Sequence, residues 1–268
     1  MKTPRFAWPA LLLVLSTGIA ARPAQPPPPP ANLSQRAGFD QKLGATLPLD
    51  ARFVDADGHE ASLARWIGDR PALLMLGYFR CPNLCDASMQ ALAHALVRAK
   101  LRPGADVDVL FVSIDPRETI ADARHSRAML AAMAPRAEAS SWRFLRGDAV
   151  AVRALAQAVG FRYEYDPRLQ QFVHPAGAVV VSDRGRVSQY LLGLDYPPRT
   201  LQLSVAAASH HLLGHLVDRL VLLCCGYDPA TGRYTVVVTR VMAYLGSASL
   251  LALLLWLGWL QRRSRRGA

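Results

Sequence analysis

A short apolar run that leads into two cysteines constrains the fold of this chain more than any other segment. The run from Ala72 to Leu76 contains no polar residue, which is typical of a strand buried on both faces of a sheet. Cys81 and Cys85 follow it, where we expect the strand to give way to a helix. Residues four apart on a helix share one face, about 5–6 Å from each other. The spacing therefore suits two thiolates that bind one soft metal ion, and it also permits a disulfide.

The apolar pattern along the rest of the chain predicts an α/β domain with a mixed sheet. We expect strands at 72–78, 107–114 and 142–145, helices at 88–100, 119–133 and 149–159, a hairpin of 178–182 with 187–191, and a further helix over 199–223. Reactive groups in open α/β sheets gather at the carboxyl ends of strands. A dithiol at the end of the first central strand fits a thioredoxin-like fold.

The two ends of the chain predict export and membrane anchoring. Residues 1–20 have basic residues followed by an apolar stretch and small residues, as a signal peptide does. Residues 21–38 hold five consecutive prolines and predict a stiff, extended tether. Residues 241–260 carry no charge and are long enough to cross a bilayer as a C-terminal transmembrane helix. The basic tail at 261–268 should stay in the cytoplasm.

This topology places the main domain at residues 39–198 and a juxtamembrane segment at residues 199–240. Both would lie on the periplasmic side of a bacterial inner membrane, held by a single C-terminal pass. The net charge of +11 does not indicate nucleic-acid binding, because many of the basic residues stand at the two ends and no base-reading motif is present.

In an oxidising compartment, two close thiols become a disulfide unless a metal or a reductant prevents it. A purely structural disulfide is the weaker interpretation, since it would close only a very small loop. A helix N-terminus lowers thiol pKa, so we expect thiolate character at both cysteines. Two cysteines do not complete a metal site, and a third ligand is needed. His174 is the best placed of the seven histidines, just before the predicted hairpin, although a surface role would also explain it.

Three segments together resemble the Sco/SenC family. They are Tyr78 to Cys85, Val112 to Thr119 and the later His174. The resemblance covers residues 39–195 and implies a thioredoxin-like, membrane-tethered copper protein that takes part in cytochrome c oxidase assembly. It implies that Cys81, Cys85 and His174 bind one copper ion, as Cu(I) or Cu(II). The implied partners are the copper-bearing subunit of the oxidase or other copper chaperones.

Two positions depart from the family pattern. Pro175 follows His174 where the family has a small hydroxyl residue, and Gly226 stands where a bulkier residue, often His, is expected. The segment from Leu222 to Tyr234 resembles the part that precedes the anchor in longer bacterial members. Asp115 has two interpretations, a turn cap before Pro116 or a hydrogen bond that tunes the metal loop.

Three functions remain open from the sequence. The first is a periplasmic copper metallochaperone. The second is a thiol–disulfide reductase in which Cys81 and Cys85 are catalytic and reduce the cysteines of the oxidase copper site. The third is a copper-dependent redox sensor. A further cluster could hold a second metal or simply form a polar helix face near the membrane; it consists of His210, His211, His215, Cys224 and Cys225.

Overall fold

The computed structural model describes residues 36–82, 84–209, 225–228, 233–236, 246–247, 249–251 and 256. The predicted signal (1–20), nearly all of the tether (21–38), most of the predicted membrane segment (241–260) and the tail (261–268) lie outside the described residues. His210, His211, His215 and Cys224 also lie outside them, as does the side chain of Cys225, so a second metal site there stays a prediction. Among the residues that are described, no helix is long and apolar enough to span a membrane.

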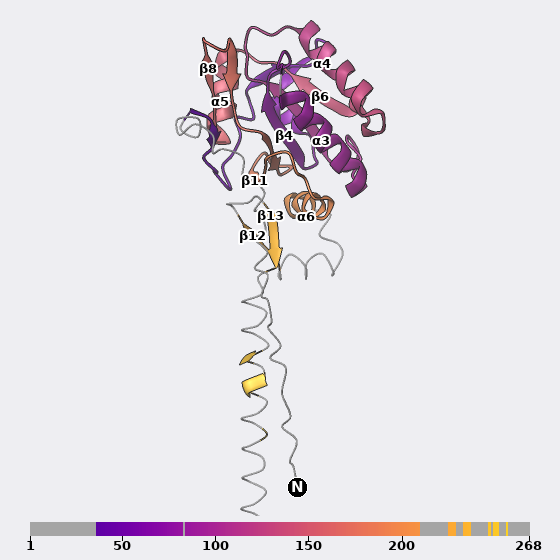
Figure 1. Cartoon of the computed structure of the whole chain (residues 1–268), viewed down its shortest axis with the longest axis vertical. Coiled ribbons are helices and arrows are strands. Elements are labelled where there is room, and N and C mark those ends of the chain that lie inside the picture. Colours follow the sequence, from indigo (N-terminus) through magenta and orange to yellow (C-terminus); the bar gives the residue numbers. More distant parts are fainter. Residues whose placement is uncertain are drawn as a thin grey trace, which may run out of the picture.

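A five-stranded mixed sheet forms the centre of the domain (Figure 1). Its strands, in spatial order, are β11 (Val187–Leu192), β10 (Gly177–Val181), β4 (Ala72–Gly77), β5 (Asp108–Ser113) and β6 (Trp142–Leu145). The strands β4, β5 and β6 are parallel, whereas β10 runs antiparallel to β4 and to β11. All five strands lie within one or two residues of the predicted ranges, because each is mainly apolar and mostly buried, and β4 and β10 are apolar throughout.

Helices cover the sheet and fix the position of the strand ends. The helix α3 (Leu84–Ala99) connects β4 to β5, and α4 (Ile120–Met133) connects β5 to β6. Both lie on one side of β4 and β6 in Figure 1, with α5 (Ala149–Ala158) on the other side. The helix α6 (Pro198–Ala208) packs against α3, β10 and β11. The helix predicted over 199–223 is not continuous, since α6 ends at Ala208, and residues 210–223 lie outside the described residues.

Local capping explains where α4 and α5 begin. Thr119 and Asp122 form a capping box, in which the Thr119 hydroxyl accepts from the Asp122 N–H and the Asp122 carboxylate accepts from the Thr119 N–H. The Asp148 carboxylate accepts the N–H groups of Val150 and Ala151, which confirms its predicted role as the cap of α5. These bonds fix the turns that enter both helices and thereby hold the strand ends next to them.

Several short elements surround the main sheet. The hairpin β2 (Arg52–Val54) and β3 (Glu60–Ser62) leads into α2 (Leu63–Ile67), and β1 (Gly38–Phe39) pairs with β7 (Phe161–Arg162). A second hairpin, β8 (Glu164–Asp166) with β9 (Gln171–Val173), was not predicted from the sequence. The strands β12 (Cys225–Asp228) and β13 (Arg233–Val236) pair with each other. The β8–β9 hairpin matters most for the site, because His174 follows directly after it.

The core lies on both faces of the central sheet. Large side chains such as Trp142, Phe111, Phe144 and Leu73 are almost completely buried. Full burial of one such apolar side chain contributes about 1.5–3 kcal/mol to stability. The result is a rigid sheet whose parallel strands all end at one edge, and the two cysteines stand at that edge.

Candidate metal centre

The two cysteines lie at the carboxyl end of β4, one in a loop and one in a helix. Cys81 belongs to the connection from β4, here called the Cys81 loop (residues 78–82), and Cys85 is the second residue of α3. The prediction that both lie on one helix face is therefore wrong for Cys81. Pro82 disfavours a helical conformation in the residue before it, which keeps Cys81 out of the helix. The loop nevertheless brings the two sulfurs together.

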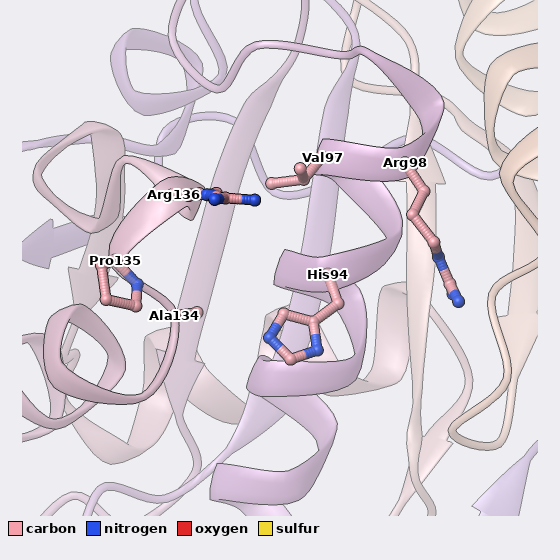
Figure 2. Close-up of a pocket in the computed structure, with 6 residues that line it drawn as sticks. All are labelled: His94, Val97, Arg98, Ala134, Pro135 and Arg136. Carbon is pink, nitrogen blue, oxygen red and sulfur yellow. The ribbon is translucent and has the colours of Figure 1, made fainter.

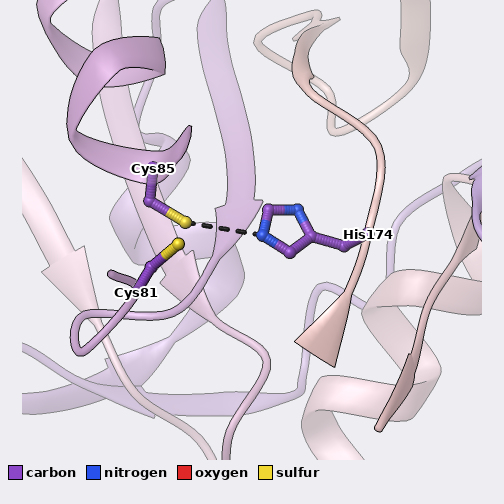
Figure 3. A group of neighbouring side chains, drawn as sticks. All are labelled: Cys81, Cys85 and His174. Atoms are coloured by element: carbon purple, nitrogen blue, oxygen red, sulfur yellow. Dashed lines mark hydrogen bonds between the residues drawn. The ribbon is translucent and has the colours of Figure 1, made fainter. Parts of the chain in front are cut away.

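His174 completes a compact group with the two thiols (Figure 3). The ligand atoms of Cys81, Cys85 and His174 all lie within 4.8 Å of one another. The Cys85 Sγ is 3.4 Å from the His174 Nε2. On its other side, His174 Nδ1 lies 3.1 Å from the Pro175 carbonyl oxygen. Because a carbonyl only accepts hydrogen bonds, Nδ1 carries the proton, and the lone pair of Nε2 faces the thiols.

This arrangement also explains how the chain tolerates Pro175. The proline contributes its backbone carbonyl, and no side-chain hydroxyl is needed to orient the imidazole. The structure therefore brings together all three predicted ligands, although they come from a loop, a helix and the end of an unpredicted hairpin. Two sulfurs and one imidazole nitrogen form a donor set suited to a soft metal ion.

Cys85 is buried, and a glycine makes room for it. Cys85 is 3 % exposed, whereas Cys81 is only partly buried. A Cβ atom on Gly77 would lie 3.1 Å from the Cys85 Sγ and 2.9 Å from the Phe111 ring. Both contacts are closer than normal packing allows, so a larger residue than glycine would displace the thiol or the ring.

The protonation of Cys85 differs from the prediction. Its hydrogen bond with Cys81, followed by burial, raises the pKa of the Cys85 thiol far above its usual value. The expectation of a thiolate at this position is thus wrong for the metal-free protein, because burial and a neighbouring sulfur outweigh the helix dipole. A metal ion that binds here must displace the proton from Cys85, which makes binding dependent on pH.

Aromatic rings enclose the imidazole. The ring centroid of Tyr78 lies 5.7 Å from that of His174, and the centroid of Phe161 lies 6.0 Å away. Phe172 packs against Tyr78 at 5.6 Å. Burial, together with the nearby Cys81, raises the pKa of the Tyr78 hydroxyl, so it stays neutral. These rings shield His174 from water and limit the directions in which its side chain can turn.

Glu118 holds the Cys81 loop, a role that was not predicted from the sequence. Its side chain is fully buried and accepts the backbone N–H groups of Phe79 at 2.8 Å and Arg80 at 2.7 Å. The Ser113 hydroxyl donates a third hydrogen bond at 2.5 Å. Burial raises the pKa of the Glu118 carboxyl, although these three hydrogen bonds oppose the shift. The loop is thus pinned directly before Cys81.

Asp115 acts as the turn cap that one of its two interpretations predicted. Its carboxylate accepts the Arg117 N–H at 3.0 Å and pairs with the Arg117 guanidinium at 2.7 and 2.8 Å. The Arg80 side chain, from the Cys81 loop, lies 3.8 Å from the same carboxylate. Asp115 therefore shapes the turn after β5 and does not contact the three candidate ligands.

The other described histidines do not join the centre. His59 lies in a group with Asp55 and Asp57, but Asp55 there accepts the backbone N–H groups of both residues, as in an ordinary turn, and Asp57 pairs with Arg127. This group is accounted for as local structure. Within the described ranges, the Cys81, Cys85 and His174 group is the one that combines thiols with an imidazole.

His94 lines a separate pocket of about 410 Å³ between α3 and the segment after α4 (Figure 2). Its walls also include Val97, Arg98 and Arg136. His94 lies nine positions after Cys85, or about 13 Å along the helix axis. With no thiol in its lining, this pocket is not part of the metal centre.

Comparisons with known proteins indicate the family and the fold of the chain. The family model described as SCO1/SenC matches residues 42–208. No curated protein sequence matches the chain significantly. Among solved structures, a candidate electron transfer protein from Aquifex aeolicus VF5 is 23% identical with a TM-score of 0.57, covering 65% of this chain and 99% of its own.

Two other solved structures are Sco proteins. BsSco, a member of the Sco family of cytochrome c oxidase assembly proteins in which a disulfide switch was identified, is 20% identical with a TM-score of 0.50, covering 63% of this chain and 96% of its own. Bradyrhizobium japonicum ScoI with copper bound is 21% identical with a TM-score of 0.47, covering 62% and 96%. At these identities, the structural likeness concerns the fold alone. The family match spans more than half of the sequence, and the chain therefore belongs to the SCO1/SenC family.

Proposed function

We propose that this protein is a membrane-anchored periplasmic copper metallochaperone that binds one copper ion through Cys81, Cys85 and His174. The observation that carries the proposal is the closeness of these three ligand atoms, all within 4.8 Å of one another before any metal is present. A site assembled in advance has little ordering entropy to lose on binding.

The donor set favours copper over zinc. Two thiolates and one imidazole suit Cu(I), which accepts few and soft ligands. A closed structural zinc site needs four protein ligands, and the described residues place three here. The single imidazole and the Nδ1 contact with Pro175 also allow a Cu(II) state, since neutral imidazole is a good ligand for both ions.

The cargo would pass to a copper site of cytochrome c oxidase. Family membership supports this partner, and BsSco is described as a member of a family of oxidase assembly proteins. The apolar run at 241–260 would anchor the domain in the inner membrane, close to a client that is itself embedded there. Confinement to one membrane raises the effective concentration of the two partners.

A thiol–disulfide reductase is the second candidate, and one observation favours it. The two sulfurs are close enough to interact, as the hydrogen bond between Cys81 and Cys85 indicates. Such a pair could reduce a disulfide in the oxidase copper site, with both cysteines catalytic. A reductase would not require His174, however, whereas a copper carrier would.

Copper titration separates the two candidates. The full-length protein, purified in detergent under reducing conditions, should bind one equivalent of copper with thiolate-to-copper absorption. His174→Ala should bind copper much more weakly, and His59→Ala, an exposed histidine remote from the centre, should behave as wild type. Equal binding by wild type and His174→Ala, or no binding by either, would remove the basis of the chaperone proposal.

A further inference from the structure

A pocket of about 260 Å³ opens beside Cys81. The pocket lies between α4 on one side and the Cys81 loop with the start of α3 on the other. From α4, its lining includes His125, Ser126 and Met129, and from α3 it includes Asp86. Met129 is 38% exposed. The pocket therefore connects solvent directly to one of the two thiols of the centre.

The two thiols differ in their access to this pocket. Cys81 lines it, whereas Cys85 does not. Cys85 is buried, and its Sγ faces the His174 Nε2. A donor atom that approaches from solvent through this opening meets Cys81 first. This asymmetry distinguishes two cysteines that the sequence alone treats as equivalent.

Two polar side chains of the pocket have no hydrogen-bond partner among the described residues. Ser126 is only 2% exposed, and its hydroxyl has no hydrogen-bond partner among the described residues. Leaving such a buried group unsatisfied destabilises the protein, and a ligand that bonds to it removes that cost. The carboxylate of Asp86 is also without a hydrogen bond or ion pair within the described part of the chain, and it lies near His125 and Cys81. Met129 supplies an apolar wall.

We propose that this pocket receives a cysteine side chain of the partner protein, and that Cys81 is the ligand that this cysteine replaces. The inference rests on the proposed function and specifies its exchange step. A volume of about 260 Å³ falls below the ~300–1,000 Å³ of small-molecule sites, so it suits one inserted residue. The Ser126 hydroxyl and the Asp86 carboxylate would bond to the backbone of that residue.

The exchange conserves charge and electrons. The incoming thiol loses its proton as its sulfur bonds to copper, and the bond from copper to the Cys81 Sγ breaks. The Cys81 thiolate then takes up one proton, and copper keeps its oxidation state. Cys85 and His174 hold the cargo during this step, since neither of them lines the pocket.

A metal-free reaction tests the pocket directly. In the full-length protein, Cys81 is left as the sole thiol by Cys85→Ser, Cys224→Ser and Cys225→Ser. The probe is the disulfide of N-acetylcysteinamide, a blocked cysteine. The Cys81 thiolate attacks this disulfide, forms a mixed disulfide and releases one molecule of N-acetylcysteinamide. Mass spectrometry gives the rate and the equilibrium constant of the reaction.

Two variants and one control distinguish recognition from simple exposure. Met129→Trp fills the pocket and should slow the reaction about tenfold, a change of about 1.4 kcal/mol. Ser126→Ala should lower the equilibrium constant about fivefold, because a hydrogen bond of about 1 kcal/mol is lost. Ala128→Trp lies on the exposed surface of α4 outside the pocket lining and should react as wild type.

The location of the adduct provides a second readout. In the mixed disulfide, the NMR signal of the Met129 methyl group should shift, and that of the buried Met75 should not. Unchanged equilibrium in Ser126→Ala together with an unmoved Met129 signal would overturn the inference. Copper stoichiometry is measured separately, so a wild type that binds no copper would overturn the proposed function and leave the result on the pocket intact.

Discussion

Replacing Glu118 by glutamine should weaken copper binding more than it weakens the fold. The Glu118 carboxylate accepts the N–H groups of Phe79 and Arg80 through different oxygens, at 2.8 and 2.7 Å. A glutamine of the same size can accept only one of them, and its NH₂ group would face the other N–H. The chain directly before Cys81 would lose one of its two anchors.

The magnitude follows from the balance of two effects. Loss of one hydrogen bond to a charged acceptor costs about 1.5–3 kcal/mol. Removal of a buried charge offsets part of this cost in global stability, since burial raises the pKa of Glu118 and thus opposes its ionised form. We expect about 1 kcal/mol lower stability in urea unfolding. The loosened loop must be ordered again on binding, which should reduce copper affinity about tenfold.

The control for this prediction is an exposed carboxylate that caps a helix. Asp148 also accepts two backbone N–H groups, at 2.9 and 2.7 Å, but it caps α5, away from the three candidate ligands. Asp148→Ala should cost about 0.5–2 kcal/mol in stability and leave copper affinity unchanged. Affinity is measured by competition with a Cu(I) chelator. If Glu118→Gln binds copper as tightly as wild type does, the positioning role assigned to this carboxylate is wrong.

Two further predictions concern packing and pH. The Cβ atom of Gly77→Ala would meet Phe111 and Cys85. The variant should therefore lose about 1–3 kcal/mol of unfolding free energy through overpacking and should also bind copper more weakly. An unchanged copper affinity would contradict the packing argument. The hydrogen bond from Arg127 lowers the pKa of Asp57 in the folded protein. The ionised Asp57 therefore stabilises the fold fully above its unfolded pKa of about 3.9, and this stabilisation is lost as the pH falls through its folded pKa. Asp57→Asn should therefore be less stable than wild type near neutral pH and equal to it in strong acid, as urea unfolding at several pH values can check.

Much of the central sheet could be predicted from the sequence, and the reason is physical. Strands that are covered on both faces are typically unbroken apolar runs, and helices between them need caps, so β4 and β10 were predicted to within one residue at each end and the cap Asp148 was predicted correctly. The β8–β9 hairpin was missed because its strands are short and partly exposed, without the alternation of a buried strand. The end of α6 at Ala208 was missed because the apolar pattern continues beyond it.

The sequence predicted which residues form the candidate site but not how they are arranged. Cys81, Cys85 and His174 were selected by residue type and by the family resemblance, and the structure brings them together. The role of Glu118 depends on contacts with residues 38 and 39 positions away, which no local pattern reveals. The protonation of Cys85 likewise follows from burial and from its neighbour, quantities that exist only in the folded chain.

X-ray absorption spectroscopy of the Cu(I)-loaded protein tests the central claim most directly. The metal should show two sulfur ligands and one nitrogen ligand, as expected if copper binds where Cys81, Cys85 and His174 meet. In His174→Ala the nitrogen contribution should disappear while the sulfur contribution remains. A spectrum with fewer than two sulfur ligands in the wild type, or an unchanged nitrogen ligand in the variant, would contradict this account of the site.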